Sequence, residues 1–205
     1  LDPRWGMEYM AHLYTMVDDY MSFHHYNHHV CVHDHDQHTH HQHTMVSRSE
    51  PLIPRFRNFD FWVLHSWGGG LIEYLDDRNQ ENSSYVVNAY YSVALLGLAF
   101  GDSNLVNAGF TIMAFDIRVA RALWHMPSDS TLYEGSFVSR NRMLGVLWAN
   151  KRDTRLWFAP EEFREKRLGV QVLPILPVTE ILFPDIGFAR ELVEWVQSSL
   201  HRPGV

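Results

Sequence analysis

The sequence has a single cysteine, Cys31, among 205 residues, so an internal disulfide bond is excluded. This cysteine content is compatible with a reducing compartment but does not require one. Basic residues are also few, because 17 Lys and Arg stand against 24 Asp and Glu, for a formal net charge of −7. Such a chain is not attracted to nucleic acid or to an anionic membrane surface. No apolar run of about 18 residues is present, so we expect no membrane span.

What the sequence does contain is enough apolar material for one domain with a sizeable core. Hydrophobic residues make up 46% of the chain and aromatic residues 14%, including 7 Trp. This aromatic content favours either a large core or a surface on which carbohydrate rings stack. The chain opens with LDPRWG, without an initiator Met or a signal-like apolar stretch, and ends with HRPGV. We interpret both ends as cuts through a longer protein.

Histidine is concentrated in one tract, FHHYNHHVCVHDHDQHTHHQHT at residues 23–44, where ten of the 14 histidines lie between His24 and His43. Neutral imidazoles bind Zn, Cu and Ni, so one interpretation is a metal-binding tract. The other is a low-complexity segment without fixed structure. A separate hypothesis is that the tract is a translated repeat or a retained intron, because its residue types differ by few codon changes. We favour the second interpretation because no spacing here defines a tetrahedral site. Cys31 is not favoured as a nucleophile, because it lies inside this low-complexity tract.

Helical spacing dominates the rest of the chain. Residues 2–22 have apolar positions at helical intervals, with Asp2 as a plausible N-cap and Pro3 at the first helical position. A second helix is predicted at about 84–99, and because it is apolar nearly all round we expect it to be buried in the core.

After the break GDSN at 101–104, an amphipathic helix is predicted to about Trp124. A buried helix joined to an amphipathic one by a short turn is typical of paired inner and outer helices. The last predicted helix spans about 187–201. Prolines in segment 170–183 favour an extended connection over a strand. The pattern therefore predicts a mostly α-helical fold.

Acidic side chains gather in segment 72–81, as Glu73, Asp76, Asp77 and Glu81. A solvated acidic loop is one interpretation. The other is glycoside hydrolysis, which needs two carboxylic acids across the scissile bond. Glu81 lies just before a predicted helix N-terminus, where the helix dipole favours an ionised carboxylate, the form a general base requires.

Other candidate sites are weaker. His65 and Ser66 suggest a Ser–His hydrolase, but Ser66 is in no G-x-S-x-G turn and adjacent residues rarely face each other productively. The glycines at 68–70 match no phosphate-binding loop. Glu134 and Glu180 lie in or near predicted turns and are interpreted as solvated.

Three long segments carry a resemblance to a known family: FRNFDFWVLHSWGGGL at 56–71, DDRNQENSSYVVNAYYSVALLGLAFGD at 76–102 and GVLWANKRDTRLWFAP at 145–160. Together they closely resemble glycoside hydrolase family 81, the endo-β-1,3-glucanases, and the plant branch that includes β-glucan elicitor-binding proteins is nearest. The resemblance covers residues 1–22 and 54–205.

The resemblance implies an all-α fold that is part of an (α/α)6 barrel, incomplete at both ends. Residues 1–205 would form this partial catalytic domain, interrupted by a His-rich low-complexity insertion at 23–50. It also implies inverting endo-hydrolysis of β-1,3-glucan polysaccharides or oligosaccharides, with no cofactor and no metal, in an extracellular or cell-wall location. The first Glu of the family signature, the general base, maps onto Glu81. A non-catalytic protein that binds β-glucan in elicitor perception is the alternative function.

Two departures from the family pattern bear on activity. Tyr85 replaces the second Glu of the signature, which family members need. The family's general acid is an Asp in a YNDHHFHYG-like motif before LDPxWG, and the chain begins after that motif. HHYNHH at 24–29 lies downstream and lacks the Asp, while Asp60, Asp76 and Asp77 are remaining acids that do not match the motif. We therefore expect little or no hydrolysis by the isolated chain.

A set of residues is expected to line the glucan-binding cleft around Glu81. Its members are acidic, amide, imidazole or aromatic side chains within the segments that carry the resemblance or in the loop at 127–135. They are Asp60, His65, Trp67, Asp77, Asn79, Tyr85, Tyr90, Tyr133 and Trp148. Trp124 and Trp157 are interpreted as packing residues.

Overall fold

The computed structural model describes residues 3–21, 29–30, 43–44, 56, 58–68 and 75–200. The chain divides into two units, residues 1–57 and residues 58–205. Within the His-rich tract the structure describes only the strands β1 (His29–Val30) and β2 (His43–Thr44), which pair antiparallel. The two interpretations of that tract therefore fall outside the described residues and stay predictions, as does the insertion at 23–50.

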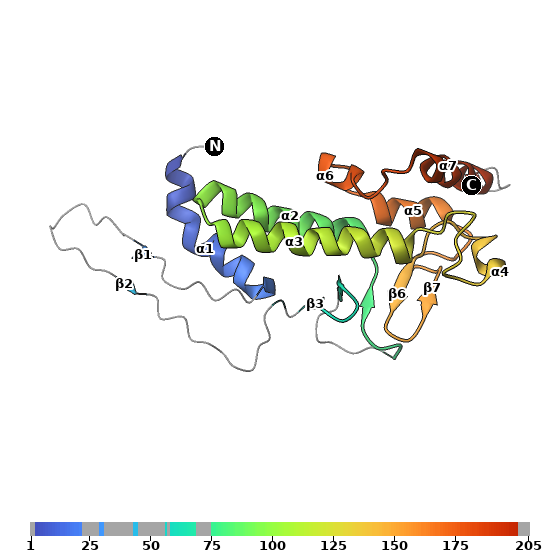
Figure 1. The fold of residues 1–205 in the computed structure, drawn as a ribbon, viewed down its shortest axis with the longest axis horizontal. Helices are drawn as coiled ribbons and strands as arrows, with labels where there is room; N and C mark the ends of the chain where they lie inside the picture. The colour runs from blue at the N-terminus through green and yellow to red at the C-terminus, as the bar shows by residue number, and fades with distance from the viewer. Residues whose placement is uncertain are drawn as a thin grey trace. The chain divides into compact units, whose positions relative to one another are not determined.

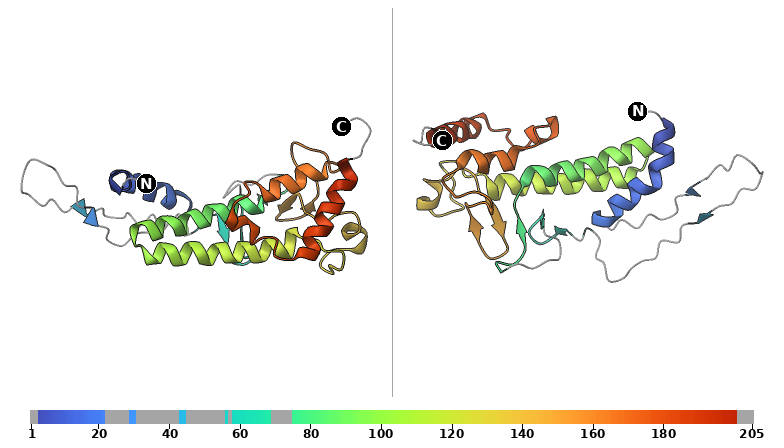
Figure 2. Two further views of the ribbon diagram at one scale, coloured as in Figure 1. Left: turned by 90° about the horizontal axis from the view of Figure 1, so that it is seen from above. Right: turned by 180° about the vertical axis from the view of Figure 1, so that it is seen from behind.

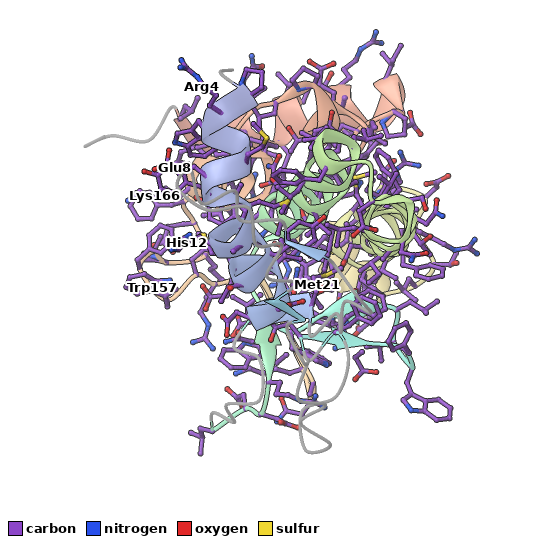
Figure 3. All side chains as sticks on the ribbon, turned by 90° about the vertical axis from the view of Figure 1, so that its left-hand side faces the viewer. Arg4, Glu8, His12, Met21, Trp157 and Lys166 are labelled. Carbon is purple, nitrogen blue, oxygen red and sulfur yellow. The ribbon has the colours of Figure 1, made fainter. Side chains whose placement is uncertain are left out.

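The first unit contains α1 (Pro3–Met21), which confirms the helix predicted at 2–22 with Pro3 as its first residue. Its suggested N-cap, Asp2, lies outside the described residues. Arg4, Glu8 and His12 follow one another along a single exposed face of α1 at intervals of four residues (Figure 3). At the end of the helix, the Met21 carbonyl accepts a hydrogen bond of 2.7 Å from the Phe56 amide.

The second unit is built on a long antiparallel helix pair, α2 (Ser83–Phe100) and α3 (Ser103–Val119), which lie side by side in every view (Figures 1 and 2). The Asn82 side chain caps α2, as the sequence predicts, by accepting a hydrogen bond from the Tyr85 amide. Gly101 ends α2 with φ of 71°, a conformation that glycine adopts without strain, and Asp102 then caps α3. The turn thus reverses the chain within two residues.

The prediction that α2 is buried in the core is confirmed for one face only. One face is buried, but Leu95 and Leu98 are 44% and 58% exposed. With 18 residues and a mean hydropathy of 1.2, α2 also just meets the length and composition of a membrane span, which the sequence analysis did not expect. Core helices of soluble proteins meet the same criterion, and a buried face packed on α3 is consistent with a core helix.

Two glycines set how closely α2 and α3 approach. A Cβ on Gly109 would lie 2.7 Å from the Ala94 amide nitrogen and 2.8 Å from the Tyr90 carbonyl oxygen. A Cβ on Gly97 would lie 2.7 Å from the Val106 amide nitrogen. Backbone therefore packs directly on backbone at two places along the pair.

The amphipathic helix predicted to about Trp124 is confirmed, with α3 continuing as the π-helical turn η1 (Ala120–Trp124). Leu105, Ile112 and Val119 of the predicted apolar stripe are buried. Trp124 is fully buried and joins Met126, Leu144 and residues of the C-terminal helix in a hydrophobic core. This core surrounds the end of α3 that lies next to the start of α2 (Figure 1).

Short strands connect these helices, and the sequence predicted none of them. β3 (Phe59–Asp60) pairs with β4 (His65–Ser66). A second sheet has the order β5 (Asn79–Gln80), β6 (Val146–Trp148) and β7 (Arg152–Asp153), all antiparallel. In its register Asn79 lies opposite Trp148, which brings segments about 70 residues apart together at the start of α2.

The C-terminal part contains α4 (Gly135–Val138), α5 (Arg164–Val172), α6 (Pro177–Glu180) and α7 (Ile186–Leu200). The predicted last helix is confirmed in α7. The extended connection predicted at 170–183 is wrong in part, because the end of α5 and all of α6 lie within it. The mostly helical class is confirmed.

Candidate functional site

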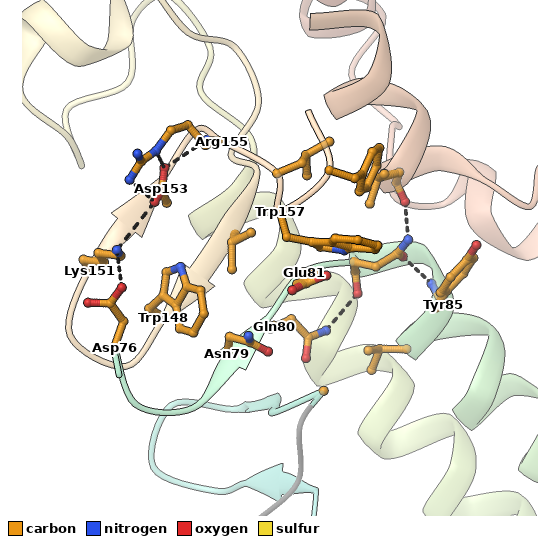
Figure 4. A pocket seen from close by; sticks show the side chains of 17 residues that line it. Asp76, Asn79, Gln80, Glu81, Tyr85, Trp148, Lys151, Asp153, Arg155 and Trp157 are labelled. Carbon is orange, nitrogen blue, oxygen red and sulfur yellow. Dashed lines mark hydrogen bonds and ion pairs between the residues drawn. The ribbon is translucent and has the colours of Figure 1, made fainter. Parts of the chain in front are cut away.

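A cavity of about 1180 Å³ opens at the N-terminus of α2, within the second unit. Its walls come from the β5–α2 turn, the β6–β7 hairpin and the segment that follows β7 (Figure 4). The lining residues most relevant to chemistry are charged, amide or aromatic: Asp76, Asn79, Gln80, Glu81, Tyr85, Trp148, Lys151, Asp153, Arg155, Trp157 and Phe158.

Glu81 occupies the turn between β5 and α2, as the sequence analysis predicts. The strand fixes the chain before it and the Asn82 cap fixes the chain after it, so its position is set from both sides. In Figure 4 it lies between Trp148 and Tyr85. Its side chain is partly buried against the cavity wall.

The surroundings of Glu81 act on its acidity in two directions. Burial raises the pKa of the Glu81 carboxyl above its ordinary value, because a charged carboxylate is poorly solvated there. A hydrogen bond from the Trp157 side chain opposes this effect and lowers the pKa. The net result is a raised pKa, with Trp157 next to the carboxylate in Figure 4.

The two other acids of the cavity are neutralised by cations. Lys151 forms an ion pair with Asp76 and lies 3.6 Å from the Asp153 carboxylate. Asp153 also pairs with Arg155, at 3.1 Å. Of the three lining acids, only Glu81 has no ion pair in the described part of the chain. It is therefore the acid best able to act on a bound water molecule.

Aromatic side chains line the cavity on both sides of Glu81. Trp157 is 80% exposed and Tyr85 is 59% exposed, so large apolar faces are presented to solvent. Phe158 contacts Trp157 edge to face, with ring centroids 5.2 Å apart. Trp148 is partly buried and lies 5.5 Å from the Lys151 ammonium. Exposed rings of this kind are suited to an amphipathic ligand such as a sugar.

Four of the ten residues predicted for the site line this cavity: Glu81, Asn79, Tyr85 and Trp148. Three others, Asp60, His65 and Trp67, form a separate cluster around β3 and β4. Burial raises the pKa of Asp60, but hydrogen bonds from the Trp67 indole (3.0 Å) and from backbone amides outweigh burial and lower it. Burial lowers the pKa of His65, whose ring contacts Trp67 with centroids 4.5 Å apart.

The remaining three predicted residues have structural contacts outside the cavity lining. Asp77 has φ of 67° and accepts a hydrogen bond of 2.8 Å from the Arg78 amide in its own turn. The buried Tyr90 hydroxyl lies 2.7 Å from the Ser66 hydroxyl. The Tyr133 hydroxyl donates to the Leu123 carbonyl at 2.7 Å, and burial raises its pKa.

The Ser–His alternative gains no support from the geometry. The His65 ring nitrogen Nδ1 lies 2.9 Å from the Ser66 carbonyl oxygen, while the Ser66 hydroxyl contacts Tyr90 and Asp116. Within the described residues, no group of three or more His, Cys, Asp or Glu is placed to hold a metal ion.

Sequence reasoning missed Trp157, Phe158 and Lys151 as cavity residues, and interpreted Trp157 as packing. The one available signal was the position of Trp157 and Phe158 in a segment that carries the family resemblance. Their exposure depends on the β6–β7 hairpin, whose pairing with β5 was not predicted.

Comparisons with known proteins identify the family of the chain. Residues 1–203 match the model of the glycosyl hydrolase family 81 C-terminal domain. A glucan endo-1,3-beta-D-glucosidase of Glycine max is 45% identical over 204 residues, covering 100% of this chain and 27% of the relative. Glucan endo-1,3-beta-D-glucosidase 2 of Saccharomyces cerevisiae is 31% identical over 116 residues, covering 57% of this chain and 15% of the relative.

A solved structure has the same fold. It is a mutant of a glycoside hydrolase family 81 protein from Clostridium thermocellum, with a TM-score of 0.62 and 22% identity over 77% of this chain and 22% of that one. The chain thus spans between 15% and 27% of the length of these relatives. Since the family model covers nearly every residue, the chain belongs to glycosyl hydrolase family 81, in its C-terminal domain.

Proposed function

We propose that this domain takes part in the endo-hydrolysis of β-1,3-glucan, with Glu81 as the general base. The observation that carries the proposal is the position of Glu81, which lines an open cavity, lacks an ion pair among the described residues and lies among exposed aromatic rings. Relatives named glucan endo-1,3-beta-D-glucosidase support the choice of substrate.

In the proposed reaction, ionised Glu81 removes a proton from a water molecule, which attacks the anomeric carbon of the bound glucan. The anomeric carbon–oxygen bond breaks as a general acid protonates the leaving oxygen. Attack by water on the face opposite the leaving group inverts the anomeric configuration. By the family resemblance, we propose that the general acid is supplied by a segment that these 205 residues do not include.

We also propose that α2 and α3 are one inner and outer pair of an (α/α)6 barrel that residues 1–205 form in part. The exposed Leu95 and Leu98 of α2 are consistent with further chain packing on this pair. An extracellular or cell-wall location is proposed by analogy with relatives such as the primary septum glucan endo-1,3-beta-D-glucosidase of Schizosaccharomyces pombe.

A chimaera tests the function, because the relatives contain segments that this chain does not match. Residues 1–205 would replace the matching segment of the Glycine max protein, and oligosaccharide release from a linear β-1,3-glucan would be measured. We expect hydrolysis with inverted anomeric configuration, which NMR of the released sugars measures. We expect a lower kcat than that of the Glycine max protein, because Tyr85 stands where the family signature has its second Glu. Glu81→Gln should lower kcat by a factor on the order of 10² to 10⁴, the usual contribution of a general base.

The matched control is Glu134→Gln, since Glu134 is exposed and lies outside the cavity lining. It should leave kcat unchanged. Full activity of the Glu81→Gln chimaera would contradict the proposal. So would saturable binding of β-1,3-gluco-oligosaccharides by the unaltered chimaera without any product, which is the behaviour of a non-catalytic β-glucan-binding protein.

A further inference from the structure

We propose that Gln171, near the end of α5, is a positioning residue that holds Glu81 in its working place. The inference rests on the proposed role of Glu81 as the base. Gln171 does not line the cavity and is fully buried, so it has no contact with solvent or substrate. It acts instead on the backbone of the turn that carries Glu81.

The Gln171 amide uses both of its ends in hydrogen bonds to segments that are distant in sequence. Its Nε2 donates to the Glu81 carbonyl at 2.6 Å and to the Gly145 carbonyl at 3.1 Å. Its Oε1 accepts from the Ser83 amide and from the Ser83 hydroxyl, each at 2.9 Å. One side chain therefore connects the turn on either side of Asn82 to the chain that enters β6.

Neighbouring residues of the same segment bond to the same turn. The Asn82 side chain donates to the Val170 carbonyl, and the Ser84 hydroxyl donates to the Leu173 carbonyl at 2.5 Å. The end of α5 thus contacts three consecutive residues after Glu81, with Gln171 contacting Glu81 itself. We call residues 170–173 the α5 bracket.

The α5 bracket is important because few direct contacts hold the Glu81 carboxylate in place. Among the described residues, the side chain that donates a hydrogen bond to it is that of Trp157, which is itself 80% exposed. The direction of the carboxylate therefore follows from the backbone at Glu81, and that backbone is fixed by the Gln171 amide. Misplacement of a reacting group by about 1 Å costs on the order of 10²-fold in rate, so a residue that holds the turn affects kcat.

Two replacements of Gln171 remove its hydrogen bonds to the turn in different ways. Gln171→Met keeps the length of the side chain but has neither the donor nor the acceptor, which leaves the buried Ser83 amide and Glu81 carbonyl without this partner. Gln171→Glu keeps an acceptor for Ser83 but, when ionised, has no donor for the Glu81 carbonyl. Both variants should release the turn at Glu81.

The first experiment follows the Glu81 carboxylate in the full 205-residue chain and needs no activity. The carboxyl carbon of 13C-labelled Glu81 would be titrated by NMR, with its signal assigned through Glu81→Gln. In the unaltered chain we expect the raised pKa that burial causes. In Gln171→Met the pKa should fall toward the ordinary value, because a released carboxylate reaches water. The negative charge added by Gln171→Glu opposes this fall, so that variant is judged by kcat.

The second experiment measures turnover in the chimaera described above. Both Gln171 variants should lower kcat by about 10- to 100-fold while KM changes by less than about twofold, because the aromatic walls of the cavity remain. Leu192→Ala is the control for stability, since Leu192 is buried in the core around α7 and lies outside the bracket and the cavity. It should lower the midpoint of unfolding but leave kcat and the Glu81 titration unchanged.

The outcomes separate the two proposals. A shifted Glu81 titration in Gln171→Met, with a chimaera that never hydrolyses glucan, supports the positioning role and refutes the function. The positioning role alone is refuted if the chimaera is active and neither Gln171→Met nor Gln171→Glu changes its kcat or the titration of Glu81. If Gln171→Met does not fold, Gln171→Glu decides. Normal kcat in that variant, at a pH above the pKa of the introduced carboxyl, would show that the bond to the Glu81 carbonyl is dispensable.

Discussion

At the residue scale, Glu81 and Trp157 form a pair in which an exposed ring controls the acidity of a partly buried acid. Burial raises the pKa of the Glu81 carboxyl and the indole hydrogen bond lowers it. A general base must be ionised, so activity rises with pH through the pKa of Glu81. On the acid side of the pH profile (the acid limb), the pH at which activity rises therefore depends both on burial and on the indole hydrogen bond.

Trp157→Phe should move the acid limb of kcat/KM in the chimaera to higher pH. The phenyl ring still covers the carboxylate but donates no hydrogen bond, so the influence that lowers the pKa is lost and the influence that raises it remains. A plot of kcat/KM against pH measures the shift. Trp148→Phe is the control, since Trp148 lines the cavity but has no bond to the Glu81 carboxylate, and its acid limb should stay in place. A limb that moves to lower pH in Trp157→Phe would contradict this account.

The sequence was sufficient to predict the place of Glu81 just before a helix, but not the contacts that hold it there. Its place before a capped helix follows from local signals, since Asn82 is a favoured N-cap and the helical pattern begins at once. Gln171 gives no such signal, because its partners Glu81 and Ser83 lie about 90 residues away along the chain. Tyr85 was predicted for the cleft, and its 59% exposure toward the cavity depends on the walls around it.

At the element scale, the α2–α3 pair depends on close contact at Gly97 and Gly109. Helix boundaries and caps were predictable because periodicity and turn residues are local properties. The degree of burial was not, since Leu95 and Leu98 are apolar yet exposed. The strands were missed because each has only two or three residues, too few for an alternating pattern, and their pairing joins distant segments.

Gly109→Ala should destabilise the chain by about 1–3 kcal/mol, the usual cost of overpacking. The added Cβ would lie within 3.0 Å of the Ala94 and Tyr90 backbone, which cannot move without separating the helices. Urea unfolding followed by far-UV circular dichroism measures the effect. Gly169→Ala in α5 is the matched control, because nothing lies within 4 Å of its added Cβ, and it should be neutral or stabilising by up to about 1 kcal/mol. Equal changes in the free energy of unfolding for the two substitutions would show that the close contact between α2 and α3 does not determine stability.

At the scale of the whole molecule, two buried ionisable groups give stability opposite dependences on pH. Asp116 accepts hydrogen bonds from the Ser66 amide (3.1 Å) and hydroxyl (3.3 Å), but burial outweighs them and raises its pKa to about 7. Burial lowers the pKa of His125 to about 3, and its ring stacks on Phe183 and Phe188 with centroids 4.9 Å away. Neither group was identified from sequence, since both depend on complete tertiary packing.

The signs follow from proton binding in the two states. Between pH 3.8 and about 7 the folded chain holds a proton on Asp116 that the unfolded chain has lost, so this group lowers the free energy of unfolding as pH rises. Between about pH 3 and 6.5 the unfolded chain holds a proton on His125 that the folded chain lacks, so this group raises the free energy of unfolding as pH rises. From about pH 4 to 6.5 the two slopes oppose each other.

Each of two single substitutions should therefore remove one of these two contributions to the pH dependence of the free energy of unfolding. Relative to the unaltered chain, Asp116→Asn should gain stability as pH rises from 4 to 7, and His125→Phe should gain stability as pH falls from 6.5 to 3. Each difference has a slope of at most about 1.4 kcal/mol per pH unit, because one proton is involved. Urea unfolding at several pH values measures both, and any misfit of the phenyl ring adds only an offset that is independent of pH. In the double variant the two differences should add, and parallel pH profiles for all four chains would contradict the assignment of these groups.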